Sequence, residues 1–273
     1  MMKIEEFYNE DTLKLFTSPY DPNIYKFKNL GIMGAVQIPL NYETPISEIV
    51  YDQGQTSMCS ACSSSKIRLY QESDDFQSGL NEKLSAGKIY ADRGDKDYKG
   101  EGMYIVETAA EWKNFGSCLE SDFPYYDTYE NILEKFNEEK DIKNIEEKSE
   151  PFKISSYYVC QNREEIQTAI MQTKAVQIGI PVYYSFYYPD SNGIVKYKKG
   201  ERNFGGHAIL IRGWKVIDNK FYWVVDNSWG KNNWTENGSC YLPEEYPWQD
   251  QATVYVDNYH EMKFKEYREK YGN

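Results

Sequence analysis

The amino-acid sequence predicts an α+β fold, in which a mainly helical part precedes a part built mainly of strands. The residues after Cys59 run as far as Gln71 without Gly or Pro, and apolar residues recur along one stripe of 103–115. Apolar runs typical of buried strands gather beyond residue 175. This order of patterns favours an α+β fold. At 273 residues the chain can bury a sizeable core, and its length allows one or two domains.

The first part of the chain should be helical. Residues 1–37 form an N-terminal extension with little periodicity, and a helical lobe is expected over 38–155. We expect helices beginning near Cys59, over 82–90 and over 103–115, with Gly116 ending the last of them. Residues 127–150 hold nine acids and four lysines, so we interpret them as an acidic insertion, a solvated helical excursion that joins the two lobes. A regulatory or partner-binding role for this insertion is the less favoured alternative.

The second part, residues 156–257, should be mainly strands. Asn162 and Glu165 form a capping-box pattern that predicts a short helix over 164–172. The charged residues 258–273 are expected to form a C-terminal tail. Strands are expected at 176–180, 208–214, 220–225, 239–242 and 253–256.

Three separated segments supply the parts of a thiol nucleophile. Cys59 lies in Gln53-Gly-Gln-Thr-Ser-Met-Cys-Ser-Ala, His207 follows two glycines, and Asn227 begins Asn-Ser-Trp-Gly. A cysteine nucleophile needs a base, a group that orients the base, and a donor for the oxyanion, and Gln53 is the candidate donor. Cys59 precedes His207 by 148 residues, and His207 precedes Asn227 by 20. This order and spacing are typical of papain and cathepsins.

Local physics supports the same interpretation. A cysteine at a helix N-terminus is favoured as thiolate, because the helix dipole and the free N–H groups are positive there. His207 alone, on an apolar strand, would more often be a core residue than a base, and the other motifs change that judgement. The only other histidine, His260, lies in the charged tail.

On these motifs the chain resembles the papain family of cysteine peptidases over roughly residues 38–257, and its bacterial and viral branch more than the secreted one. Residues 116–125 resemble a further family segment. The resemblance implies a helical lobe and an antiparallel sheet or barrel lobe with a cleft between them. It also implies a cysteine endopeptidase in which Cys59 and His207 do the chemistry, Asn227 orients His207, and Gln53 helps to hold the oxyanion. No metal or organic cofactor is required.

Other positions bear on the substrate and on departures from the family. Gly102 is the candidate for pairing with a substrate backbone, although it could equally begin the 103–115 helix. Trp229 is expected to cover the Asn–His bond and, with Gly206, to border the substrate. Ser60, Thr56 and Gly206 stand where relatives usually carry Trp, Cys, and Asp or Asn, respectively.

Several alternatives remain open. The same nucleophile could serve a transglutaminase, deamidase, amide hydrolase or peptide ligase, or the chain could be a catalytically silent binding protein. Cys59 and Cys62 also form a Cys-x-x-Cys pair, but no second pair completes a zinc site and the context does not favour a redox role. The N-terminal extension could cross the cleft and inhibit the enzyme, or it could support the second lobe, which we favour from sequence alone.

Composition limits the partners and the compartment. A net charge of −12 argues against nucleic acid, so we expect a protein or peptide substrate. No apolar run is long enough to span a membrane, and the N-terminus lacks the apolar region of a signal peptide. Five cysteines without a framework spacing, together with Thr56, predict no disulfide. We therefore expect a cytoplasmic protein or one released without a signal peptide, and the oligomeric state stays open.

Overall fold

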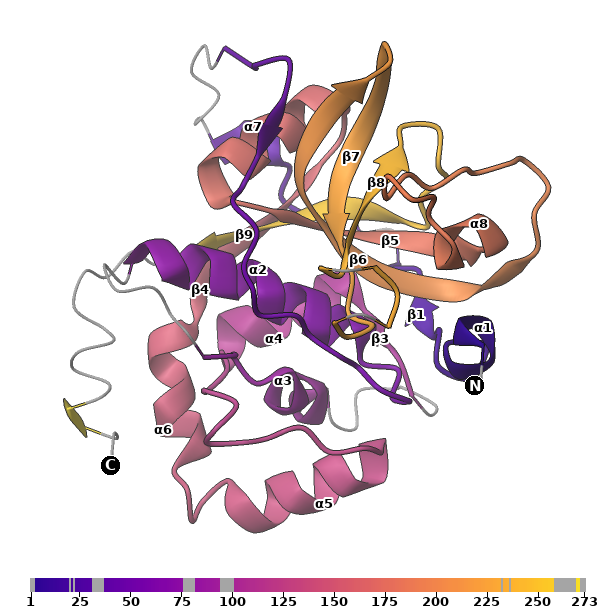
Figure 1. The fold of residues 1–273 in the computed structure, drawn as a ribbon. Helices are drawn as coiled ribbons and strands as arrows, with labels where there is room; N and C mark the ends of the chain where they lie inside the picture. The colour runs from indigo at the N-terminus through magenta and orange to yellow at the C-terminus, as the bar shows by residue number, and fades with distance from the viewer. Residues whose placement is uncertain are drawn as a thin grey trace.

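The protein folds into a helical lobe and a sheet lobe that meet along helix α2 (Figure 1). A computed structural model provides the coordinates. Among the described residues, no helix combines the length and the apolar character needed to cross a membrane. The structure describes residues 3–19, 21, 23–30, 37–75, 82–93, 101–231, 233–235, 237–257 and 269–270.

The helical lobe is organised around α2 (Cys59–Asp75), in which residues 59–72 are all buried. Three predicted features agree with the structure. The helix expected over 103–115 is α4, Gly116 ends it at φ 68°, and the helix expected over 82–90 is α3, whose start is set by the Ser85 side chain accepting from Lys88 N–H. The other helices and the short strand of this lobe are α3 (Ala86–Asp92), β3 (Met103–Tyr104), α4 (Ile105–Asn114), α5 (Tyr129–Glu139), α6 (Ile145–Ser149) and the 3-10 helix η2 (Glu150–Phe152).

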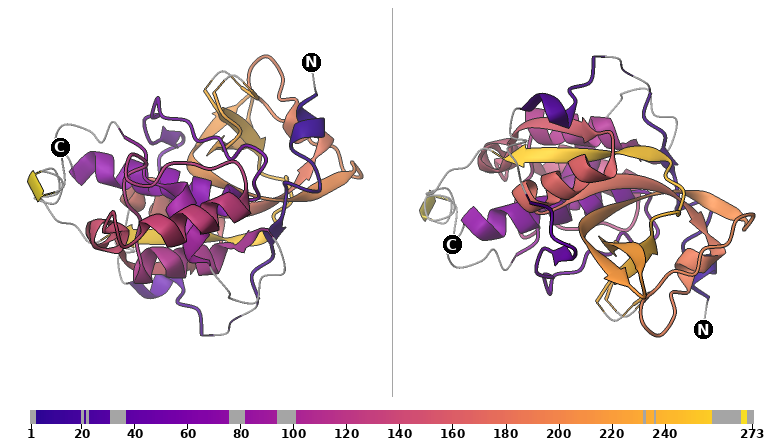
Figure 2. Two further views of the ribbon diagram at one scale, coloured as in Figure 1. Left: turned by 90° about the horizontal axis from the view of Figure 1, so that it is seen from below. Right: turned by 90° about the horizontal axis from the view of Figure 1, so that it is seen from above.

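The sheet lobe is one seven-stranded antiparallel sheet with strand order β4-β9-β5-β6-β7-β8, and β2 pairs with β6. Figure 2 shows helix α7 against this sheet. Asn162 caps α7 by accepting from Glu165 N–H at 2.9 Å, as the capping box predicts. The elements are β2 (Tyr42–Glu43), β4 (Ile154–Cys160), α7 (Arg163–Thr173), β5 (Val176–Tyr183), α8 (Tyr184–Tyr187), β6 (Asn203–Ile217), β7 (Lys220–Asp226), β8 (Ser239–Pro243) and β9 (Asp250–Asp257).

The structure confirms all five predicted strands and adds β4, together with the two-residue strands β1 (Leu15–Phe16), β2 and β3, none of which was predicted. Strand β4 pairs with β9, so the sheet lobe begins at Ile154 and the boundary expected between 155 and 156 cuts through a strand. Adjacent polar Ser155 and Ser156 interrupt its apolar pattern, and its partner lies about 100 residues further along the chain. The predicted tail over 258–273 falls outside the described residues apart from 269 and 270.

The acidic segment 127–150 is helical, as expected, but it is not simply solvated. Ile132, Phe136 and Ile145 are buried in the core of the helical lobe. The apolar sides of α5 and α6 therefore pack against that lobe while their acidic sides face outward. This burial corrects the expectation of a solvated excursion between the lobes.

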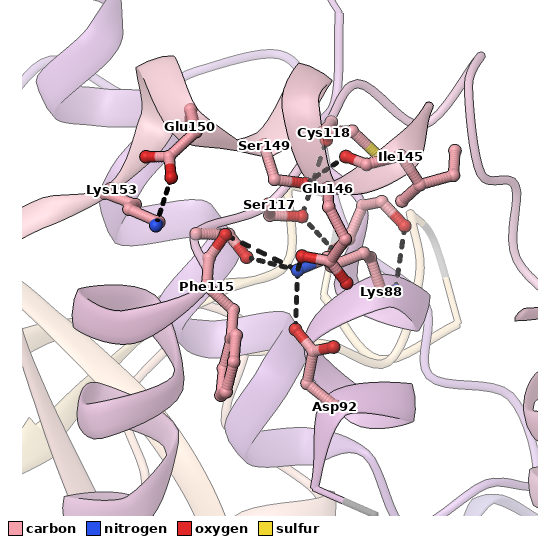
Figure 3. Close-up of polar contacts among 12 residues, drawn as sticks. Lys88, Asp92, Phe115, Ser117, Cys118, Ile145, Glu146, Ser149, Glu150 and Lys153 are labelled. Atoms are coloured by element: carbon pink, nitrogen blue, oxygen red, sulfur yellow. Dashed lines mark hydrogen bonds and ion pairs between the residues drawn. The ribbon is translucent and has the colours of Figure 1, made fainter. Parts of the chain in front are cut away.

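A buried lysine joins α3 to the segments around it (Figure 3). The Lys88 side chain is fully buried, and its Nζ lies 2.6 Å from Asp92 Oδ2, 3.2 Å from the Gly116 carbonyl and 3.5 Å from Glu146 Oε2 on α6. Burial raises the pKa of Asp92 to about 7, although the neighbouring Lys88 charge opposes this shift. The contacts join α3 to the end of α4 and to α6.

Direct hydrogen bonds hold the two lobes in register. Gln177 on β5 donates to the Ser60 carbonyl at 2.8 Å and to Ser63 Oγ at 2.7 Å, both on α2. Tyr70, also on α2, donates to Asp226 Oδ2 at 2.6 Å. These groups are buried, so losing a partner would leave an unsatisfied polar atom. Helix α2 is thereby fixed against β5 and β7.

Candidate active site

Cys59 is the first residue of α2 and lies against the sheet lobe. Its side chain is 1% exposed and packs with Leu15, Ile105 and Ala208. The backbone N–H of Ala208 donates to its Sγ at 3.4 Å. Burial raises the pKa of the Cys59 thiol to about 11, and the bonds from Ala208 and other backbone N–H groups reduce the shift.

His207 and Asn227 come from neighbouring strands and form a buried pair. His207 lies on β6, and Asn227 follows the last residue of β7. His207 Nε2 lies 2.7 Å from Asn227 Oδ1, which also accepts from Ser228 N–H at 2.7 Å. Because that oxygen accepts, Nε2 carries the ring proton and Nδ1 presents its lone pair. Nδ1 is buried without a hydrogen bond among the described residues, and burial lowers the pKa of His207 to about 4.

Gln53 is brought to the same place by the loop before α2. Its Oε1 accepts from Ser228 Oγ at 2.9 Å, and its Nε2 donates to the Thr56 carbonyl at 3.0 Å. A longer contact of 3.5 Å joins Nε2 to the Thr12 carbonyl. Ser228 therefore fixes which way the Gln53 amide faces, so its nitrogen turns away from the Asn-Ser-Trp-Gly segment.

Trp229 stacks against the His207 ring, with ring centroids 5.0 Å apart. It is 1% exposed, in agreement with the expectation that it covers the Asn–His bond. Ser60 is fully buried, and its Oγ lies 2.7 Å from Thr108 Oγ1. Cys62 packs in the helical core, and the described residues contain no group of three or more metal-ligating side chains around it.

The N-terminal segment runs between the lobes and across this site. We call residues 8–18 the strap; it follows α1 (Ile4–Phe7) and contains β1 (Leu15–Phe16). Strand β1 pairs in parallel with β3 of the helical lobe, and Lys14 forms a parallel bridge with Gly206 of the sheet lobe. Figure 1 accordingly places β1 beside β3 and β6. Leu15 is 4% exposed and packs on Cys59.

Glycines on both walls make room for the strap. A Cβ added at Gly102 would lie 2.1 Å from the Lys14 carbonyl oxygen, and one at Gly205 would lie 2.5 Å from the Leu13 oxygen. At Gly206 it would lie 2.5 Å from the Leu15 oxygen. Such distances exclude a side chain while the strap is in place, so only glycine permits this approach of backbones.

The strap contributes to the burial of this site, since Leu15 packs on Cys59. Burial favours the neutral thiol and the neutral imidazole, since it raises the pKa of Cys59 to about 11 and lowers the pKa of His207 to about 4. Removing the strap would readmit water, which would bring the pKa values of Cys59 and His207 closer to their ordinary values.

The structure thus brings together all four residues that the sequence analysis grouped, Gln53, Cys59, His207 and Asn227. Gly102 lies where a second backbone approaches, but its own N–H donates to Tyr90 Oη and its carbonyl accepts from Arg93 Nη1. The alternative base His260 lies outside the described residues. Sequence reasoning missed Ser228, although its place inside Asn-Ser-Trp-Gly was a usable signal.

Comparisons with known proteins identify the family. The model of the papain family of cysteine proteases matches residues 37–254. A gut-specific cysteine proteinase of Caenorhabditis elegans is 41% identical over 91 residues, which are 33% of this chain and 27% of that protein. Cathepsin B-like cysteine proteinase 3 of the same organism is 35% identical over 136 residues, 49% of this chain and 34% of that protein. The matches therefore span about a third or less of these relatives.

Solved structures share the fold. Xylellain, a cysteine protease from Xylella fastidiosa, superposes with a TM-score of 0.73 at 20% identity, covering 92% of this chain and 97% of that one. Procathepsin B from Trypanosoma congolense gives a TM-score of 0.65 at 15% identity, covering 92% and 88%. The chain belongs to the papain family of cysteine proteases, and its fold is the two-lobed papain-like fold.

Proposed function

We propose that the protein is a cysteine endopeptidase that cleaves peptide bonds in proteins or peptides through Cys59. The observation that carries the proposal is that Cys59 Sγ accepts from the N–H of Ala208 at 3.4 Å, next to the 2.7 Å His207–Asn227 pair, while Gln53 bonds Ser228, next to Asn227. Each of these groups answers one need of thiol acyl transfer. The activity is a proposal rather than a consequence of family membership. The matched segments cover only 27% and 34% of the two curated relatives, so the activity of those whole proteins is not carried over to this chain.

In the first step, His207 Nδ1 takes the thiol proton and the Cys59 sulfur attacks the scissile carbonyl carbon. Asn227 keeps Nε2 protonated and the ring oriented, as the acid does in serine triads. Gln53 Nε2 and the Cys59 backbone N–H stabilise the oxyanion. When the C–N bond breaks, the imidazolium gives its proton to the leaving amine, and an acyl-thioester remains on Cys59.

In the second step, His207 removes a proton from water, which attacks the thioester carbonyl. The C–S bond breaks, the carboxylic acid product leaves, and the proton returns to the thiol. Every group that acts belongs to the chain itself. Gly102 and Gly206 would border the substrate where they now border the strap, and Trp229 would lie beside the leaving group.

Within the same proposal, the N-terminal extension inhibits the enzyme. Leu15 covers Cys59, and Gln53 Nε2 faces the Thr12 carbonyl, so a substrate carbonyl cannot enter until the strap leaves. The strap also supports the sheet lobe, since Tyr8 and Leu13 are buried in its core. Peptidase activity that is the same with and without residues 3–18 would contradict the inhibitory role.

Two further assignments remain proposals. Thr56 and Ser60 favour the bacterial and viral branch, whereas the curated relatives are cathepsin B-like. All five cysteines are unpaired, which supports a reducing, cytoplasmic setting or release without a signal peptide. A disulfide found in protein taken from its natural source under non-reducing conditions would count against that setting.

A peptide-library cleavage assay tests the proposed function. We expect cleavage by the wild-type chain, loss of at least about a thousandfold with Cys59→Ala because the nucleophile is gone, and retention with the matched variant Cys62→Ala. Cleavage products are identified by mass spectrometry. Absence of any Cys59-dependent cleavage across varied sequences, both in the wild-type chain and in the chain without residues 3–18, would reject the endopeptidase and favour acyl transfer to another acceptor.

A further inference from the structure

Tyr8, the first residue of the strap, occupies a small site formed by Trp229 and Asp52. The ring of Tyr8 stacks on Trp229 with centroids 4.6 Å apart and an interplanar angle of 12°. Its hydroxyl donates to Asp52 Oδ1 at 3.1 Å. Tyr8 is only 1% exposed, so this environment encloses an aromatic side chain with a terminal donor.

The Asp52 carboxylate is held in place independently of Tyr8. Its Oδ1 accepts from Gly54 N–H at 2.9 Å, and its Oδ2 accepts from Asn233 Nδ2 at 3.3 Å. Asp52 also forms an antiparallel bridge with Trp229, which fixes the carboxylate beside the indole. A Cβ at Gly230 would lie 2.5 Å from Oδ2, so the absence of a side chain there leaves room for the carboxylate.

The charge of Asp52 has no counter-ion in the part of the chain that the structure describes. None of the ion pairs among those residues includes Asp52, and the residue is exposed. A carboxylate in this position attracts a cation or a hydrogen-bond donor and repels an anion. A flat cation can in addition stack on an indole.

The site lies on the leaving-group side of Cys59. Trp229 also stacks on His207, which would protonate the leaving amine. Along the strap, Tyr8 meets Trp229, Thr12 meets Gln53, and Lys14 meets Gly206, so Tyr8 and β1 lie at opposite ends of the cleft. When the strap leaves, a substrate residue that follows the scissile bond can take the place of Tyr8.

We propose that Asp52 and Trp229 select substrates with a flat, donor-bearing side chain, Tyr or Arg, after the scissile bond. Tyr would stack and donate its hydroxyl as Tyr8 does, and Arg would stack its guanidinium and pair with Asp52. Phe would stack without a donor, and Glu would be repelled. The proposal rests on the proposed peptidase function, but the strap allows the site to be tested without any turnover.

The first arm of the test uses position 8 of the full-length chain as the ligand. Site-specific alkylation of Cys59 by iodoacetamide, measured by mass spectrometry, reports how readily the strap leaves. We expect Tyr8→Phe to speed labelling about three- to tenfold, because the charge-assisted bond to Asp52 is lost. Tyr8→Arg should stay within about twofold of wild type, because Arg keeps such a bond. Tyr8→Glu should label fastest, because repulsion from Asp52 replaces the bond.

The same series is then measured in the Asp52→Asn background, which keeps an acceptor oxygen for Gly54 but removes the charge. In that background Tyr8→Arg should label Cys59 as fast as Tyr8→Phe does, and the faster labelling of Tyr8→Glu should come closer to that of the other variants. Asp141→Asn, an exposed aspartate of the acidic segment, is the matched control and should leave the series unchanged. An unchanged ranking in Asp52→Asn would overturn the assignment of Asp52.

The second arm compares cleavage by the full-length chain of peptides with Tyr, Arg, Phe or Glu after the scissile bond. We expect kcat/KM about five- to tenfold higher for Tyr and Arg than for Phe, with the Arg preference lost in Asp52→Asn. Equal rates for all four would overturn the substrate preference. Absence of cleavage with the alkylation ranking intact would reject the peptidase proposal and leave the recognition site supported.

Discussion

At the residue scale, the site depends on the Asn227 side-chain amide, which fixes the orientation of the His207 ring. Asn227 Oδ1 accepts from both His207 Nε2 and Ser228 N–H, so its orientation is set twice. This leaves Nδ1 as the only basic atom of the ring, and no other described side chain bonds it. The tautomer that the chemistry needs is therefore built in before any substrate arrives.

Replacing Asn227 by Ala should leave the buried His207 Nε2 without a partner. We expect kcat/KM for peptide cleavage to fall about ten- to a hundredfold, the effect of one unsatisfied buried hydrogen bond, mainly through kcat. Asn192→Ala, at an exposed turn, is the matched control. Steady-state kinetics that show an unchanged kcat in Asn227→Ala would contradict the positioning role.

At the scale of elements, the strap is held by backbone approach on both sides rather than by one strong contact. Strand β1 pairs with β3, and Lys14 bridges to Gly206 on β6. Gly206 adopts a backbone conformation open to any residue, since its φ is not positive. The glycine there is consequently required by the close approach of the strap backbone and of the Gln249 side chain, and not by the conformation of β6.

Gly206→Ala should therefore release the strap while β6 stays folded. The added Cβ would lie 2.5 Å from the Leu15 carbonyl oxygen and 2.5 Å from Gln249 Oε1. The Gln249 side chain can rotate away, whereas the contact with the Leu15 backbone is relieved by movement of the strap. We expect amide hydrogen exchange in 13–16 to accelerate at least about tenfold. Gly87→Ala, where the nearest atom would be 3.5 Å away, serves as the control. Exchange as slow as in wild type would contradict strap release.

At the scale of the whole molecule, the burial of His207 couples folding to protonation. Burial holds the pKa of His207 near 4, below its ordinary value of 6.5, so between these values the unfolded chain binds a proton that the folded chain does not. Stability from His207 is therefore full above pH 6.5 and is lost as pH falls towards 4. Asp92 has the opposite effect: its pKa is raised from 3.8 to about 7 in the folded protein, so its contribution to stability is lost as pH rises between these values.

The difference between wild type and His207→Gln isolates the histidine from Asp92. Between pH 6.5 and pH 4, wild type should lose up to about 1.4 kcal/mol of unfolding free energy per pH unit relative to His207→Gln. Urea unfolding at several pH values provides the measurement. Parallel pH profiles for the two proteins would show that His207 is not held neutral by burial.

Much of the site could be predicted because its chemistry is carried by short segments. Cys59 begins an uninterrupted helix, and His207 and Asn227 adjoin apolar strands, so each element could be recognised locally. The position of the strap could not be predicted in this way. Residues 8–18 have no periodicity of their own, and their place depends on glycines from distant parts of the chain. Strand β4 was missed for a related reason, since its pairing with β9 is long-range.

The central claim is that His207 activates Cys59 as a nucleophile once the strap has left. The direct test is the pH dependence of Cys59 alkylation by iodoacetamide in wild type, Gly206→Ala, and Gly206→Ala combined with His207→Gln. We predict that Gly206→Ala labels rapidly even near pH 6, because the imidazolium stabilises a thiolate there, and that the added His207→Gln removes this labelling. Labelling of Cys59 in Gly206→Ala that rises only above about pH 8.5, the range of an ordinary thiol, and does not depend on His207 would contradict the account.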